Sequence, residues 1–370
     1  LSKLQIYVGK ISALMNPITY AIINIAIVAL IWTGAIQVNI GNISQGNVVA
    51  LVNYMSQILV ELVKFANLIV LINKAIACGN RIEAAFEIES SLIEPEKPAV
   101  VGKKLPETVV SFDHVSLKYK NSSQDSLTDI NFDVKRGETI GIIGGTGSSK
   151  SSLVQLIPRL YDVTEGSVKV GGVDVKDYDM KFLRDQVSVV LQKNVLFSGT
   201  ILDNLRWGNE NATEEECIEA CKWACADEFI ERFPDKYNTV IERGGTNVSG
   251  GQKQRICIAR ALLKKPAVLI LDDSTSAVDT ATDAKIRAAF QKCIPGTTKI
   301  IIAQRVSSVQ DADRIVVLDD GRINGVGTHD ELVANNEIYR DIYESQTKDG
   351  GDFDLSTDAK EVTAAILLAR

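Results

Sequence analysis

The feature that most constrains this chain is a stretch of fifty consecutive residues, Ile11 to Val60, without a single Asp, Glu, Lys or Arg. It divides into two apolar blocks, Ile18 to Val38 and Val48 to about Leu71, separated by the turn-forming residues Asn39 to Asn47. Each block is long enough to cross the hydrocarbon core of a bilayer as a helix. A buried hairpin in a soluble protein is the alternative, but the uncharged run is too long for it. We expect two membrane-spanning helices.

Positive charges flank this uncharged stretch. Lys3 and Lys10 lie before it, Lys64, Lys74 and Arg81 follow the second apolar run, and the short loop carries none. Positive residues gather on the cytoplasmic side of membrane helices, so both ends of the pair are expected in the cytoplasm. The sequence thus predicts a multi-pass protein of the cell membrane whose remaining chain lies in the cytoplasm.

Two ionisable residues, Glu61 and Lys64, lie one helical turn apart in the second block. A charged residue at membrane depth indicates a cavity or a transport pathway. The two side chains could instead pair with each other near the inner interface, or lie where the helix leaves the bilayer. The sequence leaves these interpretations open.

The rest of the chain is charged and has a different periodicity. We divide the sequence into residues 1–90 with the membrane helices, a linker at 91–107 containing the proline-rich stretch Glu94 to Pro106, a domain at 108–346 and a Gly/Asp-rich, disordered tail at 347–370. In the third part, strand-like runs alternate with helical ones, which is typical of an α/β fold with a largely parallel sheet. The strand-like runs are Thr108–Phe112, Ile140–Ile143, Val187–Leu191, Ala267–Leu271, Lys299–Ala303 and Arg314–Leu318.

Other features narrow the interpretation. The net charge of −7 gives no support for nucleic-acid binding. Thr213 and Glu216 form a capping box that opens a separate helical block, Thr213 to Phe233. Cys217, Cys221 and Cys225 recur every four residues, which predicts one buried helix face rather than a metal or redox site. Because the chain begins at Leu1 rather than Met, we expect a fragment of a longer protein.

A Gly- and Ser-rich loop follows the second strand-like run and reads GGTGSSKSS from Gly144 to Ser152. It nearly fits the phosphate-binding pattern G-x-x-x-x-G-K-[ST], but position 149 is Ser instead of Gly. The amphipathic run Ser151–Leu160 follows, so backbone N–H groups at a helix start would point at phosphates. In such a loop Lys150 reaches the β- and γ-phosphates and the Ser151 hydroxyl coordinates Mg²⁺. If Ser149 needs a positive φ, its Cβ costs about 1–2 kcal/mol; if it is helical, it costs little.

Two further motifs support a nucleotide site. Asp272 and Asp273 end the strand-like run at 267–271, where one acid can hold Mg²⁺ and the next can orient a water. Val248 to Gln252 (VSGGQ) opens a helical run at 253–263 with a hydroxyl and two glycines, which is typical of a second anion site.

Together these motifs resemble the ATP-binding cassette (ABC) family over residues 108–346. The matched Walker A residues are Gly144, Gly145, Thr146, Gly147, Ser148, Ser149, Lys150, Ser151 and Ser152. Leu269 to Asp273 resembles Walker B, and Ser249, Gly250, Gly251 and Gln252 match the family signature, usually LSGGQ. Gln192 falls at the Q-loop position, which contacts Mg²⁺, and Tyr119 where an aromatic ring stacks on adenine.

The resemblance implies a P-loop NTPase domain of the ABC type with a helical subdomain, binding ATP and Mg²⁺. It assigns the metal to Ser151, Gln192 and Asp272. Membrane helices before the cassette are the exporter arrangement, in which a half-transporter has six. The two helices here then resemble the fifth and sixth of a bacterial multidrug-type exporter, with four missing upstream.

The chain departs from the family at the catalytic residues. Asp273 stands where hydrolysing members carry Glu, which withdraws the carboxylate by about 1.5 Å. Gln304 replaces the switch histidine and cannot relay a proton. With an intact signature, this pattern resembles the degenerate-site subunit of a heterodimeric exporter, whose signature completes a site on its partner half-transporter.

Two alternatives stay open. One is a regulatory subunit that binds ATP but does not power transport by turnover, and the other is a homodimeric exporter with a slow Asp273 site. The sequence does not identify the cargo, so drugs, lipids and peptides remain candidates.

Overall fold

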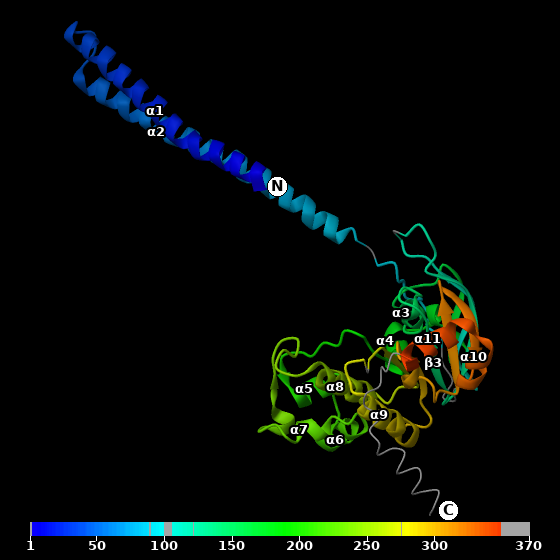
Figure 1. Ribbon diagram of the computed structural model, residues 1–370. Coiled ribbons are helices and arrows are strands. Elements are labelled where there is room, and N and C mark those ends of the chain that lie inside the picture. The colour runs from blue at the N-terminus through cyan, green and yellow to red at the C-terminus, as the bar shows by residue number, and fades with distance from the viewer. Residues whose placement is uncertain (1, 89, 100–105, 121, 275, 349–370) are drawn as a thin grey trace, which may run out of the picture. The chain divides into compact units, whose positions relative to one another are not determined.

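The computed structural model describes residues 2–88, 90–99, 106–120, 122–274 and 276–348. Its contacts divide the chain into two units, Leu1–Ser91 and Leu92–Arg370. The first unit is a hairpin of α1 (Ser2–Asn39) and α2 (Gln45–Phe86), which run side by side in Figure 1. Ser44 caps α2 by accepting a hydrogen bond from the backbone N–H of Asn47 at 3.3 Å. The predicted break between two apolar blocks is confirmed.

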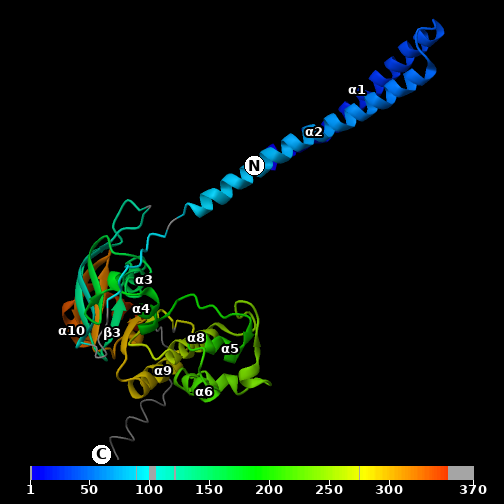
Figure 2. The same cartoon turned by 180° about the vertical axis from the view of Figure 1, so that it is seen from behind.

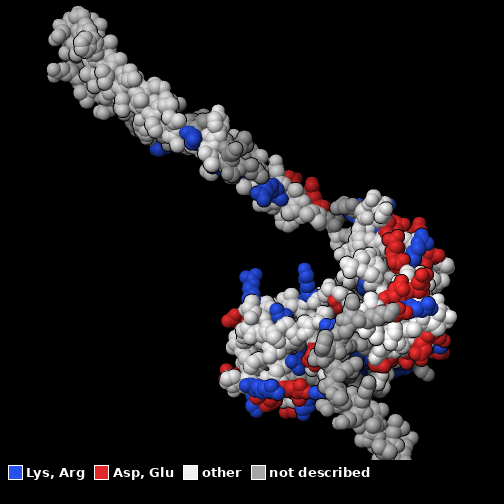
Figure 3. Space-filling model, in the orientation of Figure 1, with Lys and Arg blue, Asp and Glu red and all other residues white. Residues whose placement is uncertain are grey.

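The described side chains of this hairpin form no buried core. The apolar segments Pro17–Asn39 and Gln45–Phe86 have mean hydropathies of 2.1 and 1.8 and no buried share in the described residues, so both could cross a membrane by length and composition. Figure 3 shows few charged side chains along the visible face of the hairpin. Near the turn the helices approach closely, because a Cβ on Gly34 would lie 2.8 Å from Cγ1 of Val48.

The second unit is built on a six-stranded sheet. Its neighbouring strands are parallel except for β12, which is antiparallel to β11. In spatial order the strands are β12 (Arg322–Gly327), β11 (Arg314–Asp319), β3 (Thr139–Ile143), β10 (Thr298–Ile302), β9 (Val268–Asp272) and β6 (Val187–Val190). Five of the predicted strand-like runs lie in this sheet, so the α/β fold with its largely parallel sheet is confirmed.

The sixth run lies in a different sheet. β1 (Thr108–Leu117) pairs antiparallel with both β2 (Leu127–Lys135) and β4 (Glu165–Val170), and β5 (Val173–Asp174) completes this four-stranded sheet. Grouping residues 108–112 with the parallel strands was therefore wrong. The apolar pattern identifies a strand, but it does not specify the strand's partner or direction.

Some helices of the second unit cover the sheets, and others form a separate group. Figure 2 shows α5 and α6 grouped beside α8, away from the sheets. The helices of the second unit are α3 (Lys150–Gln155), α4 (Met180–Gln186), α5 (Ile201–Arg206), α6 (Glu214–Trp223), α7 (Asp227–Ile230), α8 (Gly250–Leu263), α9 (Thr280–Cys293), α10 (His329–Asn335) and α11 (Glu337–Lys348). Short 3-10 turns η1 (Val175–Asp177), η2 (Lys236–Asn238) and η3 (Val306–Ser308) and the strand pair β7 (Gly199–Thr200) and β8 (Val240–Ile241) complete it.

Two predicted boundaries can be compared with these elements. The capping box of α6 is present, because the Glu216 N–H donates to Thr213 Oγ1 at 3.3 Å and the Thr213 N–H to Glu216 Oε2 at 3.2 Å. The predicted tail begins at 347, but α11 extends to Lys348; residues 349–370 lie outside the described residues.

The large sheet separates two apolar clusters. On β10, Ile300 and Ile302 face one cluster and Ile301 faces the other, as expected for a strand buried on both sides.

The three cysteines predicted to share one helix face are only partly helical. Cys217 and Cys221 lie on α6, but Cys225 follows its end with φ 52°, so its place on the same helix face was wrong although it is buried. Burial raises the pKa of the Cys221 thiol, which fits a core residue.

Candidate nucleotide-binding site

The loop between β3 and α3 contains glycines that no other residue could replace without strain. A Cβ at Gly144 would lie 2.0 Å from the carbonyl oxygen of Leu318 on β11. Gly147 adopts φ +86°, which L-residues with a side chain rarely adopt. The backbone thus turns sharply from the strand into the helix, which is the path expected of a phosphate-binding loop.

Ser149 takes the strained one of the two conformations left open by the sequence. Its φ of 66° and ψ of 26° are left-handed, immediately before α3 begins at Lys150. A side chain there costs about 1–2 kcal/mol relative to glycine. The helix that follows is shorter than the predicted run at 151–160, because it ends at Gln155 and the chain turns through Pro158 and Arg159, whose φ is 50°.

Lys150 lies across the mouth of this loop. Its ammonium donates to the carbonyl oxygens of Gly144 at 2.9 Å and Gly145 at 2.8 Å, and to Ser148 Oγ at 3.2 Å. Burial lowers the pKa of this ammonium, and the nearby charges of Asp272 and Asp273 oppose the shift. The loop therefore holds one concentrated positive charge where phosphate oxygens are expected.

Asp272 ends β9 against the same loop. The Ser151 hydroxyl donates to Asp272 Oδ1 at 3.0 Å, and burial raises the pKa of this carboxyl. A hydroxyl and a carboxylate fit Mg²⁺, which takes oxygen ligands and commonly combines one or two carboxylates with substrate phosphates. No group of three or more His, Cys, Asp and Glu within the described ranges could hold a metal by itself. The residues present fit an ion that arrives with a nucleotide.

Asp273 has a different environment, although it is the next residue. Its Oδ2 accepts two amide hydrogen bonds, from Gln192 Nε2 at 3.0 Å and from Gln304 Nε2 at 2.8 Å. Burial raises the pKa of the Asp273 carboxyl, while both amide bonds favour its charged form. The three residues predicted from separate motifs thus meet at one carboxylate oxygen.

Sequence reasoning missed a residue that holds this arrangement. Gln346, on α11, donates from Nε2 to the Gln304 carbonyl oxygen at 2.7 Å and accepts at Oε1 from the Val306 N–H at 2.8 Å. It therefore fixes the backbone on which the Gln304 amide is presented. No local pattern marks Gln346, because its partners lie about forty residues earlier in the chain.

These groups surround a cavity of about 360 Å³. Its lining comprises Gly144, Gly145, Thr146, Gly147, Lys150, Ser151, Gln192, Asp272, Asp273, Ile302, Gln304 and Ile342. The loop residues Ser148, Ser149 and Ser152 are not part of this lining. Sequence reasoning did not identify Ile302 and Ile342, which follow an ordinary apolar pattern.

Tyr119 lies beside the loop rather than in the cavity. Its hydroxyl donates to Ser152 Oγ at 2.9 Å, and its ring packs edge-on against Tyr161 with centroids 5.1 Å apart. The ring is half-buried. Ser152 directly follows the loop residue Ser151, so the position of Tyr119 is compatible with the predicted adenine contact, which stays a prediction.

The VSGGQ segment, Val248 to Gln252, lies at the start of α8. Ser249 and Gln252 cap α8 reciprocally: the Gln252 N–H donates to Ser249 Oγ at 3.3 Å and the Ser249 N–H to Gln252 Oε1 at 2.9 Å. A Cβ on Gly251 would lie 2.8 Å from the Ala277 carbonyl oxygen, so this glycine permits a close approach of the two backbones. Ser249, Gly250, Gly251 and Gln252 do not line the cavity of their own chain.

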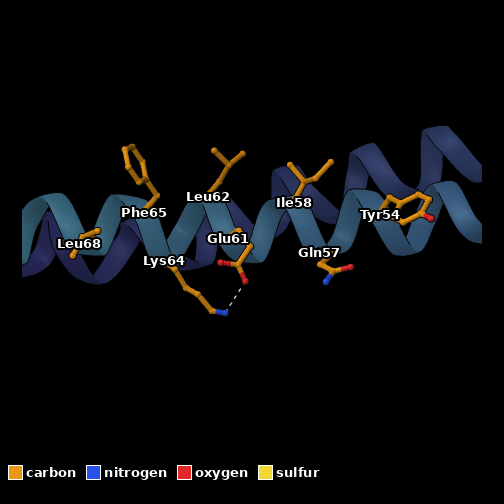
Figure 4. Close-up of a pocket in the computed structure, with 8 residues that line it drawn as sticks. All are labelled: Tyr54, Gln57, Ile58, Glu61, Leu62, Lys64, Phe65 and Leu68. Carbon is orange, nitrogen blue, oxygen red and sulfur yellow. Dashed lines mark hydrogen bonds and ion pairs between the residues drawn. The ribbon is translucent and has the colours of Figure 1, made fainter.

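The hairpin carries a second candidate feature, the ion pair predicted as one alternative. Lys64 Nζ donates to Glu61 Oε1 at 2.7 Å, with both side chains more than 60% exposed at 66% and 63%. Figure 4 shows the pair on one side of α2, opposite Ile58, Leu62 and Phe65. A groove of about 710 Å³ follows this part of the helix. The pairing interpretation thus agrees with the structure.

Comparisons with known proteins agree with this geometry. The sequence profile of a family described as ABC transporter matches residues 127–276. The uncharacterized ABC transporter ATP-binding protein YfiB of Bacillus subtilis is 40% identical over 89% of this chain and 56% of that protein. The ATP-dependent lipid A-core flippase of Alkalilimnicola ehrlichii is 37% identical over 87% of this chain and 54% of that protein.

A solved structure, that of a bacterial Atm1-family ABC exporter with ATP bound, matches with a TM-score of 0.76 and 29% identity. The match covers 93% of this chain and 60% of the chain in that structure. The chain thus spans between about half and three fifths of the length of these proteins.

The second unit is therefore a P-loop nucleotide-binding domain of the ABC transporter type, an ATPase fold that implies ATP binding, preceded by N-terminal apolar helices. The chain as a whole is similar to bacterial ABC exporters.

Proposed function

We propose that this chain is part of an ABC exporter subunit that binds ATP with Mg²⁺ and couples cassette dimerisation and ATP hydrolysis to outward transport. The part of the cavity beside the glycine loop supports ATP binding. Lys150 supplies a cation there, and Ser151 and Asp272 supply two oxygen atoms that can bind a metal. Mg²⁺, when bound, neutralises charge developing on the phosphates. The subunit would be a multi-pass protein of a bacterial cell membrane, with the cassette in the cytoplasm.

The partner would be a second half-transporter. The signature residues lie at the start of α8 and do not line their own chain's cavity, and Ser249 and Gly250 are exposed, so they are accessible to another molecule. In the family, each ATP is sandwiched between the Walker motifs of one chain and the signature of the other. An intact signature here would then complete the site of the partner.

The chain's own site would hydrolyse ATP slowly or not at all. The observation that carries this proposal is the pair of amide bonds to Asp273 Oδ2, which occupy one oxygen of a carboxylate that is already one methylene shorter than Glu. A reacting group misplaced by about 1 Å can lose roughly 10²-fold in rate. Gln304 also cannot relay a proton.

Two alternatives differ from this proposal in where turnover occurs. A regulatory subunit would clamp its cassettes on ATP without powering transport, and a homodimeric exporter would rely on a slow Asp273 site. The relatives' names include a lipid A-core flippase, so a lipid is one cargo class to test beside drugs and peptides.

ATPase activity of the full-length purified protein, alone and with the product of any adjacent gene that encodes a second half-transporter, separates these possibilities. We expect turnover only with the partner, lost in Ser249→Ala and retained in Asp273→Asn. Robust turnover of the single chain that Asp273→Asn abolishes would favour the homodimer. ATP binding without turnover in either preparation would favour the regulatory subunit.

A further inference from the structure

The linker that follows α2 is attached to the cassette at two backbone groups. The Ile93 carbonyl oxygen accepts a hydrogen bond from Arg159 Nη2 at 2.9 Å, and the Ala99 N–H donates to the Asp177 carbonyl oxygen at 2.8 Å. The Ile93 side chain itself is 77% exposed, so its carbonyl bond rather than its packing holds this point. Residues 93–99 are therefore part of the folded cassette.

Arg159 is the residue on which these attachments converge. Its side chain is only 3% exposed and forms an ion pair with Asp162, Nε to Oδ1, at 2.8 Å. Its Nη1 donates to the carbonyl oxygen of Lys176, a residue of η1, at 3.1 Å. The next residue of η1, Asp177, accepts the hydrogen bond from the Ala99 N–H. We call Arg159, Asp162 and η1 the linker anchor.

The linker anchor is also continuous with the phosphate loop. Arg159 lies four residues beyond the end of α3, the helix that begins at Lys150. Arg184 fixes the intervening turn by donating to the carbonyl oxygens of Pro158 at 3.3 Å and Arg159 at 3.0 Å. A six-residue helix is about 9 Å long, so a displacement of the loop is transmitted to Arg159 over a short, packed path.

On the other side, the chain itself connects the linker anchor to α2. α2 ends at Phe86, and Ile93 is the seventh residue after it. Seven residues span at most about 25 Å when fully extended. The covalent connection between helix and anchor is therefore short.

We propose that Arg159 is a positioning residue that couples the phosphate loop to the membrane helix α2 through the linker. The coupling role rests on the proposed function, whereas the anchoring of the linker does not. Arg159 can do this because one planar guanidinium serves Asp162, η1 and the linker at once. These partners bind at Nε, Nη1 and Nη2, and a lysine ammonium is a single compact group that does not span positions so far apart.

The test is hydrogen–deuterium exchange on the full-length protein in lipid nanodiscs, with and without ATP-Mg²⁺. Two peptides are followed, one covering residues 92–99 and one covering the end of α2 at 76–86. The variants are Arg159→Ala and Arg159→Lys, the second of which keeps the buried positive charge if the first does not fold. Arg184→Lys is the matched control, because it perturbs the same turn without touching the linker.

We expect about tenfold faster exchange in the linker peptide at the Ala99 N–H, which donates to Asp177, in both Arg159 variants. Arg159 holds both partners of that bond in place, the linker at the Ile93 carbonyl and η1 at the Lys176 carbonyl, and these charge-assisted bonds are weakened or lost. In the wild type ATP should slow exchange at the end of α2, and Arg159→Lys should remove this response while keeping ATP affinity. Arg184→Lys should leave exchange of the linker peptide within about twofold, because Arg184 does not contact the linker. A Gly-Ser-Gly-Ser insertion after Ser91 should keep the linker protected and still remove the response of α2.

Unchanged linker exchange in Arg159→Lys would overturn the anchor. Faster linker exchange with an intact ATP response of α2, or a wild type that binds ATP without that response, would overturn the coupling. A wild type that does not bind ATP would contradict the proposed function instead, and the linker peptide would still decide whether Arg159 anchors this segment.

Discussion

Two adjacent carboxylates divide the nucleotide cavity into regions of different chemistry. On the loop side, Asp272 accepts one hydroxyl bond from Ser151 and faces the Lys150 ammonium. On the amide side, Asp273 accepts two bonds from neutral amides at a single oxygen. Burial raises the pKa of both carboxyls. Burial is thus common to the two, and their hydrogen-bond partners distinguish them.

This difference indicates which steps each region can support. The loop side offers the Lys150 ammonium and the oxygens of Ser151 and Asp272, which can exchange their present partners for phosphate oxygens and a metal. The amide side offers donors that hold a carboxylate but can neither release nor accept a proton in the physiological range. The cavity is therefore equipped to bind on one side and poorly equipped for acid–base chemistry on the other.

The largest expected effect is on the loop side. Lys150→Ala should weaken ATP binding by about 100-fold or more, because charge-assisted bonds to phosphate are lost in a partly buried site. Equilibrium binding of a fluorescent ATP analogue measures this. Lys253→Ala is the control, since Lys253 Nζ also donates to a glycine carbonyl, that of Gly244 at 2.7 Å, outside the cavity. Equal affinities of the two variants would contradict the role of Lys150.

The amide side should respond to a gain of function. Asp273→Glu combined with Gln304→His restores a longer carboxylate and a group that can carry a proton, so own-site turnover should rise by roughly 10-fold to 100-fold. Single-turnover hydrolysis in a Ser249→Ala background, which silences the partner's site in our proposal, measures it. No gain, with a wild type already as fast, would remove the contrast between the two sides.

A smaller effect concerns stability and pH. Because burial raises the pKa of Asp272 in the folded state, ionisation favours the unfolded chain as pH rises above the unfolded value of about 3.9. Nucleotide-free Asp272→Asn should therefore gain Tm relative to wild type with rising pH, by about 2 °C between pH 4 and pH 7. Thermal unfolding by circular dichroism measures the gap. A gap that stays constant or shrinks would show that burial does not dominate at Asp272.

The smallest effect is expected at the backbone of the loop. Ser149→Gly removes the strain of a left-handed residue but increases unfolded-chain entropy, so we expect a net Tm gain of about 1–2 °C with ATP affinity unchanged. Ser149→Ala keeps a Cβ without the hydroxyl and isolates the backbone term. The interpretation fails if alanine stabilises as much as glycine.

Much of the fold was predictable because its signals are local. The uncharged run located α1 and α2, the capping pair Thr213 and Glu216 located α6, and apolar runs located five of the six strands of the large sheet, all but β12. Strand partners were less predictable: β1 has the same kind of apolar run as β3 but pairs antiparallel in another sheet. Burial of alternate side chains is satisfied in either arrangement.

The site divides in the same way. Its loop and strand-end residues follow a fixed spacing, so each was identified from sequence. The contacts of Asp273 were not predictable, since Gln192 and Gln304 lie 81 and 31 residues away. The conformation of Ser149 was left open because serine tolerates both backbone states. Arg159 carried a faint signal, a charged residue directly after Pro158 in an apolar segment, which gained meaning only from its burial.

The length of α2 has a mechanical consequence. Its 42 residues make a rod of about 63 Å, roughly twice the ~30 Å thickness of a bilayer core. A lever of this kind amplifies rotation: a tilt of about 10° about one end displaces the other by about 11 Å. Small angular changes at one end of α2 would therefore produce large strokes at the other.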